Sequence, residues 1–193
     1  MMNTLILATG SAGKIQELSS LLAPINCIPQ NELHIAAAEE TGLSFIENAI
    51  IKARNASQCG YPALADDSGL VIEALGGDPG IYSARFSGVG ASDSANIQKV
   101  LEQMQGVVDR RAYFYCVVAL VRHPEDPTPL LAIGKLEGMI TERPSGSKGF
   151  GYDPIFFLLE QRCTLAELLP EQKNKISHRA QALQMLLKSK NLA

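Results

Sequence analysis

The sequence lacks the patterns typical of thiolate-metal, disulfide-rich and membrane-spanning proteins. Its four cysteines are widely scattered, with no C-x-x-C pair and no nearby histidine. A thiolate zinc site is therefore not expected, and buried free thiols in a reducing compartment fit better than disulfides. The longest apolar runs, such as residues 114–121, are far too short to cross a bilayer. The first residues also lack the basic segment of a signal peptide. We expect a cytoplasmic protein without a membrane partner.

The sequence also has little net charge and no internal repeats. The formal net charge is −3 and there is no long basic run. This argues against a general nucleic-acid surface, which needs many phosphate contacts. There is no repeat at a solenoid period and no composition typical of disorder. A chain of 193 residues with 46% hydrophobic residues fits a single domain, residues 1–193, with a substantial core. An enzyme or a small-ligand binder is the expectation.

The first feature that is present is a turn between an apolar strand, residues 4–8, and a helix. The turn consists of Thr9, Gly10, Ser11, Ala12, Gly13 and Lys14. Small residues let the backbone approach a ligand, and a helix N-terminus offers free N–H groups to an anion. It is not a P-loop, because Ala8 replaces the first glycine and Ile15 replaces the Ser or Thr after the lysine. A phosphate-binding turn and a plain strand-to-helix turn both remain open.

The second feature is the acidic stretch Asp66-Asp67-Ser68-Gly69, which follows an apolar run. Adjacent side chains of a strand point to opposite faces, so the two aspartates would do different jobs. One would hold a metal or a water, and the other would orient backbone or a basic partner. Taken alone, the stretch slightly favours an acidic turn at a strand end.

A helix over residues 44–57 is predicted upstream of the acidic stretch. Ser44 and Glu47 have the spacing of a capping box. Lys52 on this helix, and Glu40 in the loop before it, are residues that are most often exposed to solvent. They gain interest only if the fold brings them beside the aspartates. The buried face is predicted to comprise Phe45, Ala49, Ala53 and Ala56.

The second half of the chain is predicted to contain a helix from residue 92 to 104, then long strands over residues 111–122 and 129–140. A short strand follows at residues 155–159, and a weak helix at residues 165–175. The last helix is predicted to begin at Ser177-His178-Arg179 and to bury a stripe of Ala180, Leu183 and Leu187.

A glycine-rich segment, residues 145–154, contains Phe150, Gly151, Tyr152 and Asp153. Its aromatic rings would either stack on a flat ligand or pack in the core. His178 and Arg179, at the start of a helix, would either donate hydrogen bonds to a planar ligand or be simply exposed. Lys173 provides a further phosphate-type group.

Together these features suit a nucleoside triphosphate handled with Mg²⁺, which prefers carboxylate and phosphate oxygens. No arrangement of serine, cysteine and histidine suggests a covalent nucleophile, so water is the expected attacker.

The motifs also occur in the order found in a known family. They are Thr9-Gly10-x-x-x-Lys14, Glu39-Glu40-Thr41-Gly42, Phe45-x-Glu47-Asn48-Ala49 with Lys52-Ala53, Ala65-Asp66-Asp67-Ser68-Gly69-Leu70, Gly80-Ile81-Tyr82-Ser83-Ala84-Arg85, Gly149-Phe150-Gly151-Tyr152-Asp153-Pro154 and Ser177-His178-Arg179. Over nearly its whole length the chain resembles the Ham1-like inosine triphosphate pyrophosphatases. The resemblance implies an elongated α/β fold with a long mixed β-sheet, flanking helices and two lobes around a central substrate cleft, assembled as a homodimer. It also implies conversion of dITP, ITP or XTP to the monophosphate and pyrophosphate, which clears deaminated purines from the nucleotide pool.

The resemblance implies residue roles as well. Asp67 would be the proton acceptor and, with Glu40, a Mg²⁺ ligand, while Asp66 and Lys52 would support them. Residues 9–14 would bind phosphate, and Ser68 would touch the substrate. The base would be chosen by Phe150, Gly151, Tyr152, Asp153, Lys173, His178 and Arg179. One position departs from the family, because Ser11 stands where asparagine is usual. Serine is shorter and lacks an amide donor, so a weakened or water-relayed contact is expected there.

Two other readings are weighed against this one. A Maf-like nucleotide pyrophosphatase, acting on other nucleotides, should open with S-x-S-x-x-R instead of residues 9–14. A non-catalytic nucleotide sensor would not release pyrophosphate.

Overall fold

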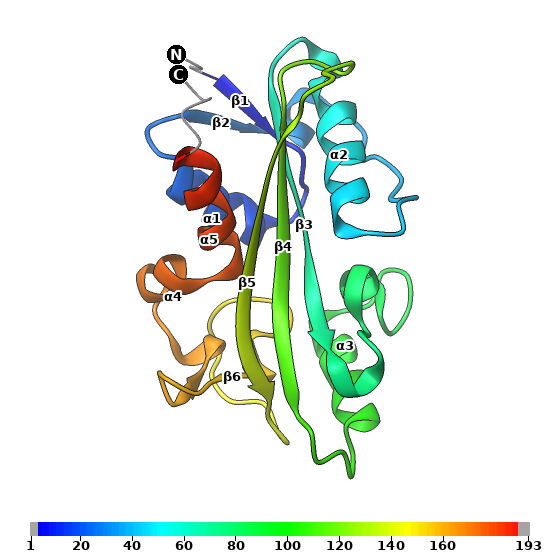
Figure 1. The fold of residues 1–193 in the computed structure, drawn as a ribbon, viewed down its shortest axis with the longest axis vertical. Coiled ribbons are helices and arrows are strands. Elements are labelled where there is room, and N and C mark those ends of the chain that lie inside the picture. The colour runs from blue at the N-terminus through cyan, green and yellow to red at the C-terminus, as the bar shows by residue number, and fades with distance from the viewer. Residues whose placement is uncertain (1–3, 189–193) are drawn as a thin grey trace. The chain divides into compact units, whose positions relative to one another are not determined.

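A single mixed sheet organises the fold, which comes from a computed structural model that describes residues 4–188 (Figure 1). The strand order is β2-β1-β3-β4-β5-β6-β7. The strands are β1 (Thr4–Leu7), β2 (Asn26–Pro29), β3 (Ala63–Ile72), β4 (Arg111–Val121), β5 (Leu130–Ile140), β6 (Phe156–Leu158) and β7 (Cys163–Thr164). β1 pairs in parallel with β2 and β3, whereas β6 pairs antiparallel with β5 and β7. The predicted mixed α/β sheet is therefore confirmed.

The α-helices of the described residues flank this sheet. They are α1 (Ala12–Leu22), α2 (Phe45–Ala56), α3 (Asp93–Gln103), α4 (Pro170–Ile176) and α5 (His178–Lys188). The capping box predicted for α2 forms only in part, because Ser44 caps the helix but Glu47 binds the residue before the N-cap. The backbone N–H of Glu47 donates to Ser44 Oγ, and the Glu47 carboxylate accepts from Leu43 N at 2.8 Å. On the inner face of α2, Ala49, Ala53 and Ala56 are buried, while Phe45 is only half-buried.

Two predictions for the C-terminal part are wrong in detail. Residues 165–175 do not form one helix: a 3₁₀ turn over Leu165–Glu167 is separated from α4 by extended backbone at Leu169. Pro170 explains the break, since a residue before proline is disfavoured in the helical conformation. In α5, Leu187 is 41% exposed and Leu186 is buried instead, because the buried stripe continues at the third residue after Leu183 and not at the fourth.

The chain divides into two compact units. Unit 1 contains residues up to 67 together with 116–134 and the C-terminal helix, and unit 2 contains residues 68–115 and 135–177. The core of unit 1 packs β1, β3 and β4 residues against α1 and α5. The core of unit 2 packs the other ends of β3, β4 and β5 with α3 and β6. Strands β3, β4 and β5 contribute residues to both units. The prediction of one domain stays a prediction.

All four cysteines are free thiols, as expected. Only Cys116 is fully buried, however, and Cys59 is exposed, so the prediction of buried thiols is wrong for that residue. Within residues 4–188, no helix combines the length and hydropathy needed to cross a bilayer.

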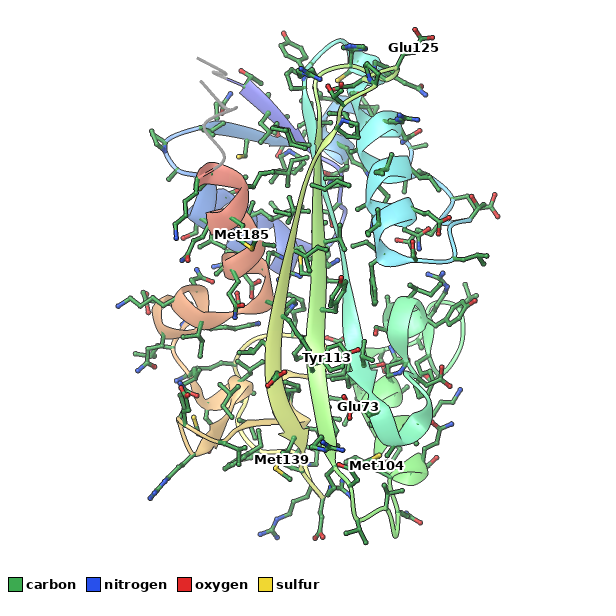
Figure 2. The ribbon with its side chains drawn as sticks, viewed as in Figure 1. Glu73, Met104, Tyr113, Glu125, Met139 and Met185 are labelled. Atoms are coloured by element: carbon green, nitrogen blue, oxygen red, sulfur yellow. The ribbon has the colours of Figure 1, made fainter. Side chains whose placement is uncertain are left out.

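The loop that joins β4 to β5 is held by a buried carboxylate. Asp126 Oδ2 accepts from both Arg122 N and Arg122 Nε, at 2.9 and 2.8 Å. Glu125, its neighbour, lies at the tip and points away from the strands (Figure 2). The polar groups of Arg122 and Asp126 therefore stabilise the turn itself.

Candidate active site

The two aspartates lie inside β3 and not at its end, so the reading of an acidic turn is wrong. Asp66 is 1% exposed and Asp67 is 6% exposed. Successive residues of a strand face opposite sides of the sheet. Accordingly, Asp66 contacts side chains of α1 and α5, whereas Asp67 contacts a side chain of α2. Figure 1 shows the same division, with α1 and α5 side by side and α2 across the strands from them. The prediction that the two carboxylates do different jobs is supported by this geometry.

Asp66 is the centre of a buried charge cluster. Its Oδ2 lies 3.0 Å from Lys14 Nζ and 3.1 Å from Arg179 Nη2. Arg179 is 1% exposed, and its Nη1 also donates to the Glu17 carboxylate. Burial alone would raise the pKa of Asp66, but the cationic Lys14 and Arg179 outweigh burial and lower that pKa below its usual range. Asp66 is therefore a fixed anion and is unsuited to carry a proton during a reaction.

Asp67 lies in a different environment. Its Oδ1 accepts from Lys52 Nζ at 2.6 Å, and the same ammonium group lies 3.1 Å from Glu40 Oε1. Burial raises the pKa of Asp67, and the adjacent Lys52 opposes that rise only in part. The pKa of Lys52 is itself raised, because its carboxylate neighbours outweigh the effect of burial. Lys52 is thus a half-buried partner of two acids and not the solvated helix lysine that is the usual case.

The acids around Lys52 fit a divalent cation. Asp67 Oδ2 is buried and has no hydrogen-bond partner among the described residues, so one strong acceptor is left for a ligand. Within residues 4–188, no group of three or more His, Cys, Asp or Glu residues is arranged to hold a metal. Mg²⁺ does not require one, since it usually takes one or two carboxylates together with waters and substrate phosphates. Glu40 and Asp67 match that donor set.

The turn before α1 has free donors. Ser11 is the N-cap residue of α1 but forms no capping bond with its side chain. Its backbone N–H donates instead to Thr9 Oγ1 at 3.2 Å. Gly10, Ser11 and Ala12 are exposed, so the first-turn N–H groups of an eleven-residue helix face a possible anion. Lys14 extends from this turn to Asp66.

Unit 2 holds the glycine-rich segment in a defined conformation. Asp153 Oδ2 accepts from Phe150 N at 3.0 Å and from Lys173 Nζ at 2.5 Å. Lys173 Nζ also lies 4.5 Å from the centre of the Phe150 ring. Gly149 is required here, because its φ is +76° and an added Cβ would lie 2.0 Å from Asp153 Oδ2. Lys173, Asp153 and Phe150 thus form one contact group.

Tyr152 has a different role from the stacking that the sequence allowed. Its ring is 4% exposed and belongs to the core of unit 2, and its hydroxyl donates to the Ser83 carbonyl at 2.8 Å. Burial raises the pKa of this hydroxyl. The buried position of Tyr152 favours packing in the core over stacking on a ligand. Phe150 is half-buried, so its ring is the aromatic of this segment that could stack on a base.

His178 and Arg179 open α5 in unit 1 and are not exposed, contrary to the simpler of the two readings. An added Cβ at Gly134 on β5 would lie 1.9 Å from the His178 carbonyl oxygen, so only glycine lets the helix start approach the strand. The Arg179 side chain is committed to Asp66 and Glu17. Ser68, half-buried on β3, lies next to Asp67 along the chain. Its substrate contact stays a prediction, as do those of His178 and Arg179.

The structure brings together two separate sets of predicted residues. Unit 1 gathers Lys14, Glu40, Lys52, Asp66, Asp67 and Arg179, and unit 2 gathers Phe150, Asp153 and Lys173. Sequence reasoning missed Glu17 and Asp93. Glu17 lies three residues after Lys14 on α1, so helical spacing was an available signal. Asp93 belongs to none of the motifs, and the sequence pattern placed it only within the predicted helix of residues 92–104.

The sequence model of the Ham1 family matches residues 5–189 of the chain. A relative named dITP/XTP pyrophosphatase, from Legionella pneumophila (strain Lens), is 58% identical over 188 residues, which cover 96% of this chain and 97% of the relative. A relative of the same name from Shigella flexneri is 55% identical over 191 residues, with the same coverage. The solved structure of a HAM1 protein from Coxiella burnetii matches with a TM-score of 0.91 at 48% identity, and the match covers 100% of both chains.

Proposed function

The chain belongs to the Ham1 family, and on this premise we propose that it hydrolyses dITP, ITP and XTP to the monophosphate and pyrophosphate. Relatives named dITP/XTP pyrophosphatase, 58% and 55% identical along almost the whole chain, support the proposal. The structural observation that carries it is the pair of acids around Lys52, the buried Asp67 and the half-buried Glu40, with Asp67 Oδ2 lacking a partner among the described residues. Such a site suits a reaction that needs both a base and a divalent cation.

Glu40 and Asp67 would hold the Mg²⁺ ion. When bound, the ion offsets charge on the triphosphate and makes an attacking water more acidic. Asp67 accepts the proton of that water on its carboxylate. Because burial raises its pKa, Asp67 is a stronger base than an exposed aspartate. The ammonium group of Lys52 keeps the carboxylate ionised before the proton arrives.

Asp66 has a supporting role in this proposal. Its low pKa keeps it charged, so it anchors Lys14 and Arg179 and does not compete for the proton. Lys14 and the N–H groups at the start of α1 would bind phosphate oxygens. Ser11 leaves this contact to backbone groups and water, since a serine hydroxyl does not reach as far as an asparagine amide. Water attacks the α-phosphorus, and pyrophosphate leaves.

The base would be selected mainly by Phe150 and Lys173 in unit 2. The Phe150 ring offers a flat apolar surface, and the Lys173 ammonium group beside it is a hydrogen-bond donor. A donor suits the 6-keto oxygen of hypoxanthine or xanthine, whereas the 6-amino group of adenine would meet it donor to donor. Polar groups that are left unpaired by the wrong base can favour the right base by roughly 10⁴-fold. Guanine also carries a 6-keto group, so the site would have to exclude guanine through its 2-amino group.

One assay tests the proposed function. Pyrophosphate release is measured from ITP, dITP, XTP, GTP, ATP and TTP, each with and without Mg²⁺. The expected result is rapid, Mg²⁺-dependent release from the first three and slow release from the others. Equal rates with ATP and ITP would reject selectivity for deaminated purines. Preference for TTP would favour the Maf-like alternative, and absence of pyrophosphate despite nucleotide binding would favour a sensor.

Homodimer formation, implied by the family resemblance, and the cytoplasmic location expected from the sequence are part of the same proposal. Sedimentation equilibrium of the purified chain tests the first, with a mass near twice 20.8 kDa as the expected result. Fractionation of cells that express the chain tests the second.

A further inference from the structure

The glycine-rich segment, residues 145–154, which would receive the base, is held by a residue of another element that has no assigned role. Asp93 is the first residue of α3, in unit 2, and its Oδ2 accepts a hydrogen bond from Gly151 N at 2.6 Å. Such a short contact between an N–H group and an ionised carboxylate is of the stronger, charge-assisted type. It joins two segments that are 58 residues apart in the sequence.

This contact fixes one particular peptide plane. The N–H of Gly151 belongs to the plane that joins Phe150 to Gly151, so holding it restricts ψ of Phe150 and thereby the direction in which the Phe150 ring is presented. Gly151 itself has a φ of +60°, in the left-handed region that glycine adopts most readily. On the other side of the plane, Phe150 N donates to Asp153. Both N–H groups that flank Phe150 are therefore held by carboxylates.

Asp93 is supported by a helix that is capped and packed against the core. Ser92 caps α3, with its Oγ accepting from Ala95 N at 3.2 Å. Ile97 and Val100 of the same helix are buried in the core of unit 2. A carboxylate in the first turn is also favoured by the helix dipole. A second anchor, from the Tyr152 hydroxyl to the Ser83 carbonyl, holds the next residue of the segment.

We propose that Asp93 is a positioning residue for base recognition, which holds the Phe150–Gly151 peptide so that the Phe150 ring and Lys173 face a planar purine. This inference rests on the proposed function, because it needs the base to bind at Phe150. It predicts an effect on KM and on the choice of base, and little effect on kcat, since Asp93 bonds to the segment proposed to bind the base and is not one of the acids proposed for the chemical step.

The test uses three variants of the full chain. Asp93→Ala removes the acceptor, Asp93→Asn keeps an acceptor without the charge, and Ser92→Ala weakens the cap of α3 without touching Gly151. Steady-state pyrophosphate release gives KM and kcat for ITP and ATP, and thermal unfolding gives stability. The amide proton of Gly151, observed by ¹⁵N–¹H NMR in the absence of nucleotide, reports the hydrogen bond independently of activity.

For Asp93→Ala we expect the KM for ITP to rise about threefold to tenfold, the range that loss of one hydrogen bond gives, with kcat within about twofold of wild type. The Gly151 amide proton should move upfield. Asp93→Asn should recover most of the KM. Ser92→Ala should lower the melting temperature but leave KM and the Gly151 resonance unchanged.

An equal rise of KM in Asp93→Ala and Ser92→Ala would assign the effect to the stability of α3 and overturn the inference. An unchanged KM in Asp93→Ala, with an active wild type, would overturn it while the proposed function stands. An Asp93→Asn variant that behaves like Asp93→Ala would also count against positioning by a hydrogen bond. If the wild type fails to hydrolyse ITP, the proposed function fails first, and the inference falls with it.

Discussion

The buried guanidinium of Arg179 allows the most direct test of the charge cluster in unit 1. Replacing it by methionine keeps much of the apolar stem but leaves Asp66 and Glu17 without their shared cation. Removing one partner of a buried ion pair typically costs about 3–5 kcal/mol, because the remaining charge is left uncompensated. In a chain of this size, each kcal/mol corresponds to roughly 2–4 °C in melting temperature. We therefore expect Arg179→Met to melt about 10 °C below wild type at pH 7, as measured by far-ultraviolet circular dichroism.

Arg111 provides a matched control. It also faces two carboxylates, Asp109 at 2.6 Å and Glu73 at 3.5 Å, but its side chain is 69% exposed, whereas that of Arg179 is 1% exposed. Exposed ion pairs contribute little to stability, since water and salt screen them. Arg111→Met should therefore melt close to wild type. Equal losses in the two variants would mean that burial does not amplify the Arg179 cluster, and the reasoning would be refuted.

The effect of Arg179→Met should also depend on pH with a definite sign. In the wild type the pKa of Asp66 is lowered by Lys14 and Arg179. A carboxyl with a lowered pKa contributes stability that is fully present above its unfolded pKa, near 4, and is lost as the pH falls toward the folded value. Without Arg179, Lys14 still lowers the pKa of Asp66, but the effect of burial is opposed less strongly and part of this stabilisation is lost. The difference between variant and wild type should therefore be largest at neutral pH and shrink as the pH falls below about 4. A difference that grows in acid would contradict the assignment.

Three further predictions follow from the site. Asp67→Asn should lower kcat for pyrophosphate release by about 10²-fold or more, the usual contribution of a general base, while the circular dichroism spectrum stays unchanged; near-normal turnover would exclude Asp67 as the proton acceptor. Dialysis against EDTA should abolish turnover, and added Mg²⁺ should restore it in wild type; activity that survives chelation would remove the metal from the proposal. Gly149→Ala should raise the KM for ITP and lower the melting temperature, because the left-handed φ and a Cβ 2.0 Å from Asp153 Oδ2 leave no unstrained arrangement. A variant with wild-type KM and stability would show that the loop tolerates the displacement.

Local patterns predicted much of the fold. The alternation of a strand correctly separated Asp66 from Asp67, because the period of two is a property of the backbone and needs no tertiary information. The helix starts at Ser44 and Ser92 were likewise set by residues within one turn, since each serine side chain caps its helix. Apolar spacing alone predicted one helix over residues 165–175, but Pro170 interrupts it in the structure.

The roles of Lys52, Arg179 and Asp93 were beyond such reasoning for one shared reason. Arg179 meets Asp66 across 113 residues, Lys52 meets Asp67 across 15, and Asp93 meets Gly151 across 58. A lysine or arginine on a helix is usually solvated, and nothing nearby in the sequence marks the ones that are buried. Only the sheet, which places β3 next to helices from distant parts of the chain, decides which cation meets which acid.

The charge balance around β3 bears on how the proposed substrate and metal would bind. In the contacts of unit 1, the carboxylates of Glu17, Glu40, Asp66 and Asp67 outnumber the cations of Lys14, Lys52 and Arg179 by one. A nucleoside triphosphate is strongly anionic, so without a further cation it would meet a site of like charge. A divalent ion alone would in turn have to compete with Lys52 for Glu40 and Asp67. Both costs fall if ion and nucleotide bind together, because phosphate oxygens then supply the remaining ligands and an acceptor for Lys52. The apparent affinity for Mg²⁺ should therefore rise sharply when a non-hydrolysable ITP analogue is present, which titration calorimetry measures directly.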